Sequence, residues 1–297
     1  MRVSVAGLGC NRLGEPSLAE RRWVALASRA ADQGVNIFDT SDSYNTTRSE
    51  TILGKAFGHR EDVYIATKFS GFGGSCRKDL TIAAMEKSVE GSLRRLRRDC
   101  IDIYQLHSPR LEDLQRSDWY EGMARMVDAG KIRCSAVALR NLSDGLWIIK
   151  NCSVDVLQVT YNLLEPEAEE ALFAMAREHG VGLLVRKPYQ RGALTGKFVP
   201  GRKLPDGHRA LLEGDRLGTH LRRAELFRPL AMSRTGGMLG LALQYCLGPE
   251  AVSTVIPGAR SEEQLGANIQ AANAPELSKL EYDEIGRIQR SWLAEVA

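Results

Sequence analysis

The sequence predicts an α/β protein of the closed (β/α)8 barrel type, with parallel strands in a single domain. Two observations support this prediction. Short apolar runs rich in β-branched residues recur along the 297 residues, and amphipathic helical patterns separate them. No stretch rich in proline, glycine and serine divides the chain into two parts. Eight strand–helix units in a chain of this length fit a closed barrel, and a doubly wound open sheet is the alternative.

The expected strands are short and would be joined by helices that cross from one strand to the next. The strands cover Val3–Leu8, Val35–Phe38, Val63–Ala66, Ile101–Leu106, Ile132–Ala138, Val154–Val159, Val181–Val185 and Val252–Ile256. The helices cover Ser17–Gln33, Leu80–Leu96, Asp118–Ala129, Glu167–His179 and Met238–Leu247. Strands that alternate with helices in this way are typically parallel. The single domain is expected to span 1–297, with a long substrate and cofactor loop over about 187–235.

Composition excludes several classes of protein. The chain has 40 Lys and Arg against 37 Asp and Glu, a formal charge of +3, which argues against a nucleic-acid partner. No apolar run approaches the roughly 20 residues of a membrane-spanning helix, and the first residues lack a signal-peptide pattern, so a cytoplasmic protein without a membrane partner is expected. Six cysteines without a CxxC pair indicate reduced thiols and no metal site.

Polar, titratable residues follow three consecutive expected strands. Asp39 ends the second strand and Tyr44 follows five residues later, Lys68 ends the third, and His107 ends the fourth. Because active sites of these barrels lie where strands end and the following loops begin, the four side chains should converge. Taken singly, each residue could instead have a structural role: the aspartate as a helix cap, the lysine as a solvated surface residue, and the histidine as a hydrogen-bond partner of a backbone carbonyl.

These four residue types suit the reduction of a carbonyl group by hydride. The carbonyl oxygen needs an acid as the hydride arrives, and Tyr44 could donate that proton. A phenol is a reluctant acid near neutral pH, so a cation beside it is required. Lys68 would supply this charge, Asp39 would hold Lys68 in place, and a neutral His107 could orient the carbonyl oxygen.

The sequence resembles the aldo-keto reductase family in several segments. These are NIFDTSDSY, YIATK, IDIYQLHSP, GKIR, DVLQVTYNLLE, GALTGKF and VIPGARSEEQLGANI, within a resemblance that runs from Val3 to about residue 290. The resemblance places Asp39, Tyr44, Lys68 and His107 on the family's catalytic tetrad. It implies an NADPH-dependent oxidoreductase that reduces a small-molecule carbonyl to an alcohol on a TIM barrel.

The expected cofactor site lies around the last strand. A helix begins near Ser261, and such helix N-termini bind phosphate in barrels; Ser261 and Gln264 also match a capping box. By the resemblance, Arg260 would bind the 2′-phosphate of NADPH, Gln264 and Asn268 the adenosine end, and Gln158 the nicotinamide carboxamide. The loop after strand seven would hold the pyrophosphate through Gly192, Leu194, Gly196 and Lys197. The remaining expected cofactor contacts are Gly9, Cys10, Asp39, Arg186 and Gly258.

Three positions depart from the family pattern. Ala138 and Leu139 replace a Ser-Asn pair that binds the carboxamide, and Arg186 replaces the aromatic residue that stacks on the nicotinamide. These departures leave two alternatives open: a redox-neutral enzyme such as an epimerase that retains its cofactor, or a non-catalytic NADPH-binding sensor. Basic residues in the expected loops predict a polar, sugar-like substrate; they are Arg12, Arg140, Arg186, Lys187 and Arg191.

Overall fold

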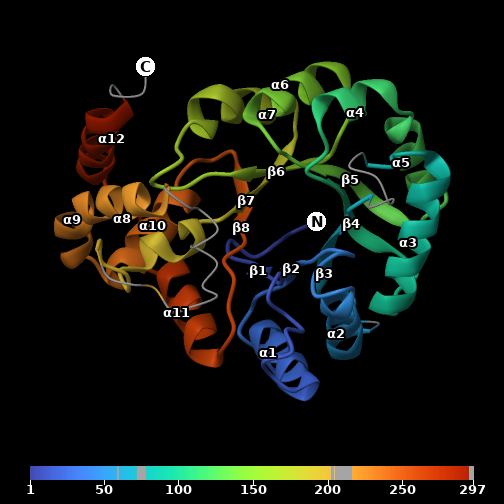
Figure 1. Ribbon diagram of the computed structural model, residues 1–297, viewed down its shortest axis with the longest axis horizontal. Coiled ribbons are helices and arrows are strands. Elements are labelled where there is room, and N and C mark those ends of the chain that lie inside the picture. The colour runs from blue at the N-terminus through green and yellow to red at the C-terminus, as the bar shows by residue number, and fades with distance from the viewer. Residues whose placement is uncertain (59, 72–77, 202–203, 205–215, 294–297) are drawn as a thin grey trace.

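The computed structural model describes residues 1–297 except 59, 72–77, 202–203, 205–215 and 294–297. Its strands form one parallel sheet in which each strand pairs with the next along the chain, around which the helices are arranged (Figure 1). The strands are β1 Leu8–Gly9, β2 Ile37–Asp39, β3 Tyr64–Phe69, β4 Ile101–His107, β5 Ile132–Ala138, β6 Val156–Thr160, β7 Gly182–Arg186 and β8 Val252–Val255. The predicted (β/α)8 fold is confirmed.

Backbone contacts between the last and first strands close the sheet. Ala6 bridges Val255, Gly9 bridges Gly258, and the Gly7 amide donates to the Val255 carbonyl at 2.8 Å. The expected first strand, residues 3–8, is wrong in extent because only Leu8–Gly9 is regular strand. The reason is local: the Ser4 amide donates to the Asn36 side chain at 2.6 Å, which takes the place of a ladder hydrogen bond.

The helices form the outer layer. Between β1 and β6 they are α1 Glu20–Asp32, α2 Arg48–Phe57, α3 Ile82–Leu96, α4 Leu111–Arg116, α5 Trp119–Asp128 and α6 Leu142–Asn151. After β6 come the π-helical turn η1 Glu169–Phe173, α7 Ala174–Glu178, the 3-10 segment η2 Gln190–Thr195, α8 Arg216–Leu226, α9 Arg228–Met232, α10 Gly237–Leu247, α11 Glu262–Ala272 and α12 Lys279–Leu293. No helix in the described part of the chain is long and apolar enough to cross a membrane.

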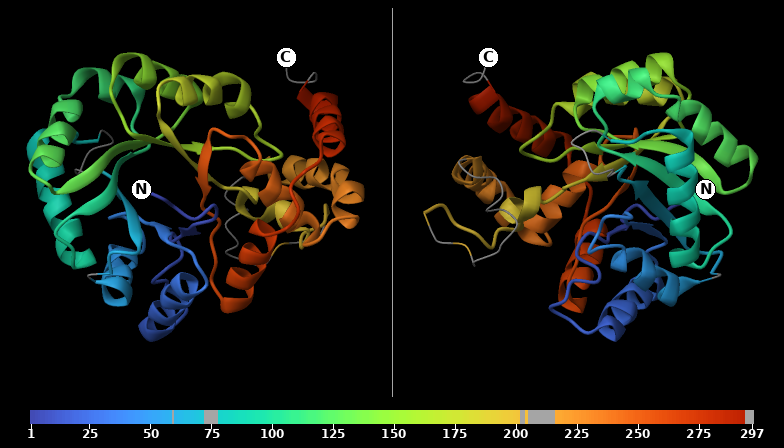
Figure 2. Two further views of the ribbon diagram at one scale, coloured as in Figure 1. Left: turned by 180° about the vertical axis from the view of Figure 1, so that it is seen from behind. Right: turned by 45° about the vertical axis from the view of Figure 1, so that its right-hand side comes forward.

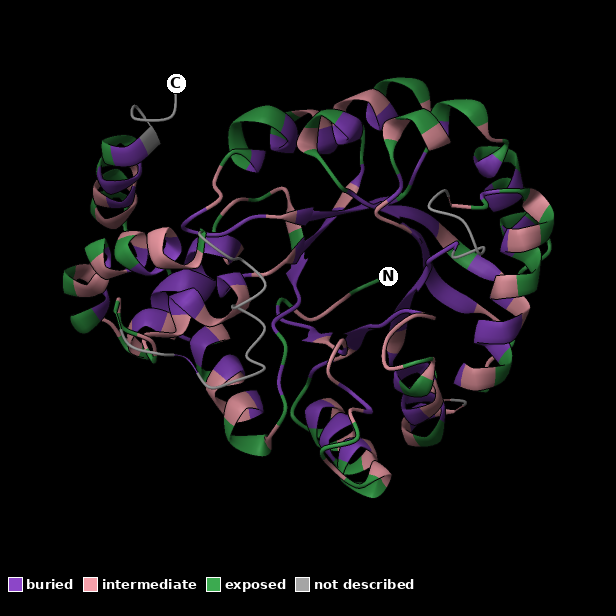
Figure 3. Ribbon diagram, in the orientation of Figure 1, coloured by how far each residue is buried: buried purple, intermediate pink, exposed green. Residues whose placement is uncertain are grey.

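The core has two parts, and the strands are buried between them (Figure 3). One small cluster takes a single residue from each of β2 to β7: Ile37, Ala66, Ile103, Ala136, Val156 and Leu184. Such a layer of inward side chains fills the centre of a closed barrel. Val3 packs against it, and the N-terminus lies inside the ring in Figure 1. The larger cluster packs the outer strand faces against the helices.

The segment 187–235, expected as a long loop, contains helices among its described residues, while 202–203 and 205–215 lie outside them. Four buried apolar residues at helical spacing explain α8 and α9: Leu221, Ala224, Phe227 and Ala231. Phe227 packs edge-on against Trp292 of α12, with ring centroids 5.7 Å apart. Helices α8 and α9 lie to one side of the barrel (Figures 1 and 2), in the part of the chain between β7 and β8.

Candidate active site

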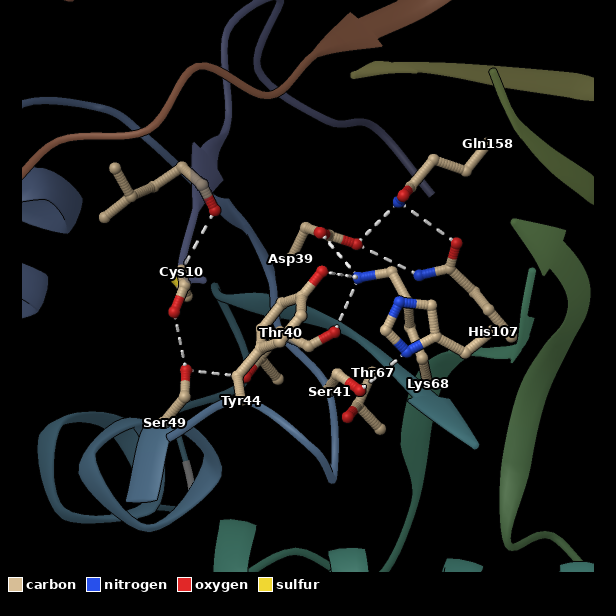
Figure 4. Close-up of polar contacts among 12 residues, drawn as sticks. Cys10, Asp39, Thr40, Ser41, Tyr44, Ser49, Thr67, Lys68, His107 and Gln158 are labelled. Carbon is tan, nitrogen blue, oxygen red and sulfur yellow. Dashed lines mark hydrogen bonds and ion pairs between the residues drawn. The ribbon is translucent and has the colours of Figure 1, made fainter. Parts of the chain in front are cut away.

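A buried lysine forms the centre of a polar cluster at the carboxyl ends of β2, β3 and β4 (Figure 4). Lys68 is 1% exposed, and its Nζ donates to Asp39 Oδ2 and to the Thr40 carbonyl, both at 2.7 Å. The same Nζ lies 3.4 Å from the hydroxyl of Tyr44. Burial alone would lower the pKa of Lys68, but the Asp39 carboxylate and Tyr44 raise it above its ordinary value. The side chain is therefore a cation held at a fixed position.

Two buried amides hold the Asp39 carboxylate from the inside of the barrel. Asp39 Oδ1 accepts from Gln158 Nε2 at 2.7 Å and from Gln105 Nε2 at 3.1 Å. Gln158 was expected near the cofactor, whereas Gln105 was missed by the sequence reasoning. Gln105 is fully buried, but β4 also carries other polar residues such as Asp102, so the sequence pattern did not single it out. With all its oxygens bonded, Asp39 is fixed where it pairs with Lys68.

A left-handed turn places Tyr44 above the lysine. The three residues that follow it, Asn45, Thr46 and Thr47, have φ angles of 50°, 54° and 68°. A hydrogen bond links this turn to the loop after β1, since Asn45 Nδ2 donates to the Leu13 carbonyl at 2.7 Å. Tyr44 is half-buried, and its ring centroid lies 4.9 Å from Lys68 Nζ.

The His107 ring stands edge-on to Tyr44, with centroids 5.7 Å apart and an interplanar angle of 85°. Its Nδ1 lies 3.1 Å from Ser41 Oγ and 3.2 Å from Ser70 Oγ. Burial, and after it the positive charges of nearby side chains, lower the pKa of His107 to about 3. His107 is therefore neutral near pH 7. The sequence reasoning missed Ser41 and Ser70, whose hydroxyls meet this ring only in the folded chain.

These residues lie beside a cavity of about 770 Å³ between the tetrad and the β7 and β8 loops. Of the sequence-predicted cofactor residues, those that line it are Gly9, Asp39, Gln158, Arg186, Gly192, Lys197, Gly258, Arg260, Gln264 and Asn268. Three others lie outside the lining. Cys10 and Leu194 are buried, and Gly196 follows η2 with a φ of 71°. Burial raises the pKa of the Cys10 thiol, so it stays protonated.

The N-terminus of α11 borders the far end of the cavity. Ser261 caps this helix by accepting from the Gln264 amide at 3.3 Å. Gln264 Oε1 accepts from the Arg260 amide at 2.9 Å, so the motif is not a reciprocal capping box. Asn268 donates to the Gly258 carbonyl at 3.2 Å, and Arg260 is exposed. A basic side chain and several amides therefore meet at a helix N-terminus, an arrangement that suits an anionic group.

Arg186 crosses from the end of β7 toward the end of β5. Its Nη2 donates to the Leu139 carbonyl at 2.8 Å, while its buried Nε has no hydrogen-bond partner among the described residues. Ala138 and Leu139 are buried and present only apolar side chains there. The guanidinium thus occupies the end of the cavity next to the tetrad. Within the described ranges, no group of three or more His, Cys, Asp and Glu residues could hold a metal ion.

Comparisons with known proteins agree with this architecture. The chain is 31% identical to the holo form of the aldo-keto reductase AKR11C1 from Bacillus halodurans, with a TM-score of 0.83 over 96% of this chain and 92% of that one. It is 30% identical to the uncharacterized oxidoreductase YqkF of Bacillus subtilis, over 94% of this chain and 90% of that protein. It is 29% identical to a probable voltage-gated potassium channel subunit beta of Oryza sativa, over 90% of this chain and 87% of that protein. The Aldo/keto reductase family model matches residues 6–290, and the chain belongs to this family.

Proposed function

We propose that this chain is an NADPH-dependent oxidoreductase that reduces the carbonyl group of a small polar molecule to an alcohol. The observation that supports this most directly is the buried ammonium of Lys68, 2.7 Å from Asp39 Oδ2 and 3.4 Å from the Tyr44 hydroxyl. A phenol releases its proton more readily when a cation stabilises the phenolate that remains. Tyr44 is the general acid in this proposal.

Each residue of the tetrad has one task in the reaction. NADPH, when bound, supplies the hydride. The Tyr44 hydroxyl donates its proton to the substrate oxygen as negative charge develops there. Lys68 stabilises the phenolate, and Asp39 holds the ammonium. The neutral His107, in the cavity wall beside the proton donor, would orient the substrate oxygen.

The cavity residues fit a dinucleotide phosphate in charge and in hydrogen-bonding groups. Arg260, beside the N-terminus of α11, would bind the 2′-phosphate, with Gln264 and Asn268 at the adenosine end. Gln158 uses its amide nitrogen for Asp39 and Gln105, so its amide oxygen remains for the carboxamide of the nicotinamide. Gly192 and Lys197 of the loop after β7 would hold the pyrophosphate, and Gly9 and Gly258 complete the cavity-lining set. Leu194, Gly196 and Cys10 lie outside the lining, so their proposed part is to shape the backbone of these loops.

The basic lining supports a polar substrate. Arg12, Arg186, Lys187 and Arg191 line the cavity, whereas Arg140, also expected there, is not part of its lining. Charged and hydrogen-bonding groups in a partly desolvated cavity favour a hydroxylated or anionic ligand over an apolar one.

Arg186 also favours a second candidate, a redox-neutral enzyme or a sensor that keeps its reduced cofactor. A guanidinium beside the nicotinamide would repel the positively charged oxidised ring. It would therefore weaken binding of NADP⁺ more than binding of NADPH, so that the reduced cofactor is the form that stays bound.

One experiment separates these functions. The purified chain is incubated with NADPH and a panel of hydroxylated and apolar aldehydes, and both loss of NADPH absorbance and product are measured. We expect one NADPH oxidised per alcohol formed, with higher kcat/KM for the hydroxylated aldehydes. Isomerised product without net oxidation would favour the redox-neutral enzyme. Tight NADPH binding without any product would favour the sensor.

A further inference from the structure

Arg186 is a cation in the cavity wall that uses little of its hydrogen-bonding capacity. A guanidinium carries five N–H donors, but here Nη2 donates to the Leu139 carbonyl and the buried Nε has no partner. Among the described residues, Arg186 forms no ion pair with a carboxylate. Burial lowers the pKa of its guanidinium, although an arginine keeps its charge in proteins. Unpaired donors in such a place cost free energy, so the position suits an acceptor supplied by a ligand.

The guanidinium reaches across the end of β6, because β6 lies between β7, which carries Arg186, and β5, which Leu139 follows. Gln158 lies two residues before the register partner of Arg186 on β6, and it lines the cavity. Its Nε2 donates to Asp39 and Gln105, as Figure 4 shows, while its Oε1 has no hydrogen-bond partner among the described residues. Donors from β7 and an acceptor from β6 therefore border the same end of the cavity.

A primary amide fits this pair of groups, since its oxygen accepts hydrogen bonds and its nitrogen donates them. The neighbouring groups do not offer a second donor. Ala138 and Leu139 have buried, apolar side chains, and the Leu139 backbone amide donates to the Gln158 carbonyl at 2.9 Å. The amide nitrogen of Gln158 is also fully used. Beside Gln158, Arg186 is therefore the donor best placed for an amide oxygen.

We propose that Arg186 is a specificity-determining residue for the cofactor, which donates to the carboxamide oxygen of the nicotinamide while Gln158 Oε1 accepts from the carboxamide nitrogen. This inference rests on the proposed NADPH dependence. The reduced ring delocalises electrons onto the carboxamide oxygen, which strengthens the hydrogen bond from a cation, whereas the oxidised ring carries a positive charge that Arg186 repels. Arg186 therefore sets the preference of the site for the reduced cofactor.

Dissociation constants of the full-length protein, measured by isothermal titration calorimetry, test this role. The ligands are NADPH, NADP⁺ and 2′-phospho-ADP-ribose, which keeps the phosphates but lacks the nicotinamide ring. In Arg186→Met we expect at least about tenfold weaker binding of NADPH, a smaller loss for NADP⁺ because a repulsion is also removed, and unchanged binding of 2′-phospho-ADP-ribose. Arg140→Met is the matched control and should leave all three constants unchanged, since Arg140 is an exposed cation next to Leu139 and outside the cavity lining.

The thionicotinamide analogue of NADPH separates the hydrogen bond from the charge. Its sulfur is a weaker acceptor than the amide oxygen, so Arg186→Met should weaken binding of the analogue at least about threefold less than binding of NADPH. Arg186→Lys keeps the charge but not the planar set of donors. This variant should bind NADPH more weakly than the wild type does and should still prefer NADPH to NADP⁺.

The outcomes distinguish the inference from the function on which it rests. An unchanged Kd for NADPH in Arg186→Met would overturn the inference, as would equal weakening of NADPH and 2′-phospho-ADP-ribose, or of NADPH and the thionicotinamide analogue. A wild-type protein that binds neither NADPH nor 2′-phospho-ADP-ribose would contradict the proposed function, and the inference with it.

Discussion

At the scale of single residues, burial lowers the pKa of His107. This shift predicts that the free energy of unfolding depends on pH. The pKa of His107 in the folded chain is about 3, below the usual value near 6.5. Between pH 6.5 and pH 3, His107 therefore binds a proton in the unfolded chain but not in the folded chain. Stability therefore falls as pH drops through this window. At pH 5 the loss from this group is about 2 kcal/mol relative to pH 7.5.

The measurement is urea unfolding of the wild type and His107→Gln at pH 7.5 and pH 5. We expect the variant to lose about 2 kcal/mol less on acidification than the wild type. His179→Gln, an exposed histidine after α7, is the control and should follow the wild type. If His107→Gln and the wild type lose the same free energy of unfolding on acidification, the lowered pKa of His107 is contradicted.

Arg260 predicts a difference between two cofactors. Arg260→Ala should weaken NADPH binding by about 1.5–3 kcal/mol, the strength of a charge-assisted hydrogen bond, and leave NADH binding nearly unchanged, since NADH lacks the 2′-phosphate. Dissociation constants for both cofactors are measured by fluorescence titration. Arg287→Ala, which removes a surface ion pair with Glu284 on α12, is the control. Equal weakening of both cofactors would show that Arg260 does not bind the 2′-phosphate.

At the element scale, the close approach of the first two strands depends on a glycine. A Cβ on Gly7 would lie 2.7 Å from Ile37 Cγ2 and 2.8 Å from the Ile37 carbonyl oxygen. Gly7→Ala should therefore destabilise the fold by about 1–3 kcal/mol, because the barrel must separate at β1 and β2. In Gly266→Ala on α11, the added Cβ meets nothing within 4 Å, and a stability gain of up to about 1 kcal/mol is expected. Urea unfolding measures the free energy of unfolding of both variants. A Gly7→Ala variant as stable as the wild type would contradict the close contact.

Elements with a strong apolar pattern could be predicted from the sequence, and others could not. The fifth strand was predicted with the bounds it has, Ile132–Ala138, because it begins with a buried isoleucine and ends in four consecutive buried residues. The first strand was not, since side-chain hydrogen bonds of Ser4 and Asn36 replace part of its ladder. Helix α2 was missed because it begins after three left-handed residues, with no capping side chain at Thr47.

At the scale of the whole molecule, closure of the barrel brings distant strand ends to one cavity. The tetrad positions could be predicted because residues that end parallel strands share one edge of the sheet. The groups that support them could not, because Ser41, Ser70 and Gln105 meet His107 and Asp39 only through strand register and loop geometry. Arg186 likewise was expected near the nicotinamide, but its bond to the Leu139 carbonyl depends on the spacing of β5 and β7.

The central claim is that Tyr44 donates the proton in a carbonyl reduction, and Tyr44→Phe tests it most directly. Phenylalanine keeps the ring beside His107 and Lys68 but removes the hydroxyl. We predict that kcat with NADPH and glyceraldehyde falls at least about a hundredfold while the Kd for NADPH changes little. Tyr120→Phe, on the exposed face of α5, should keep wild-type kcat. Near-normal kcat in Tyr44→Phe would contradict the account.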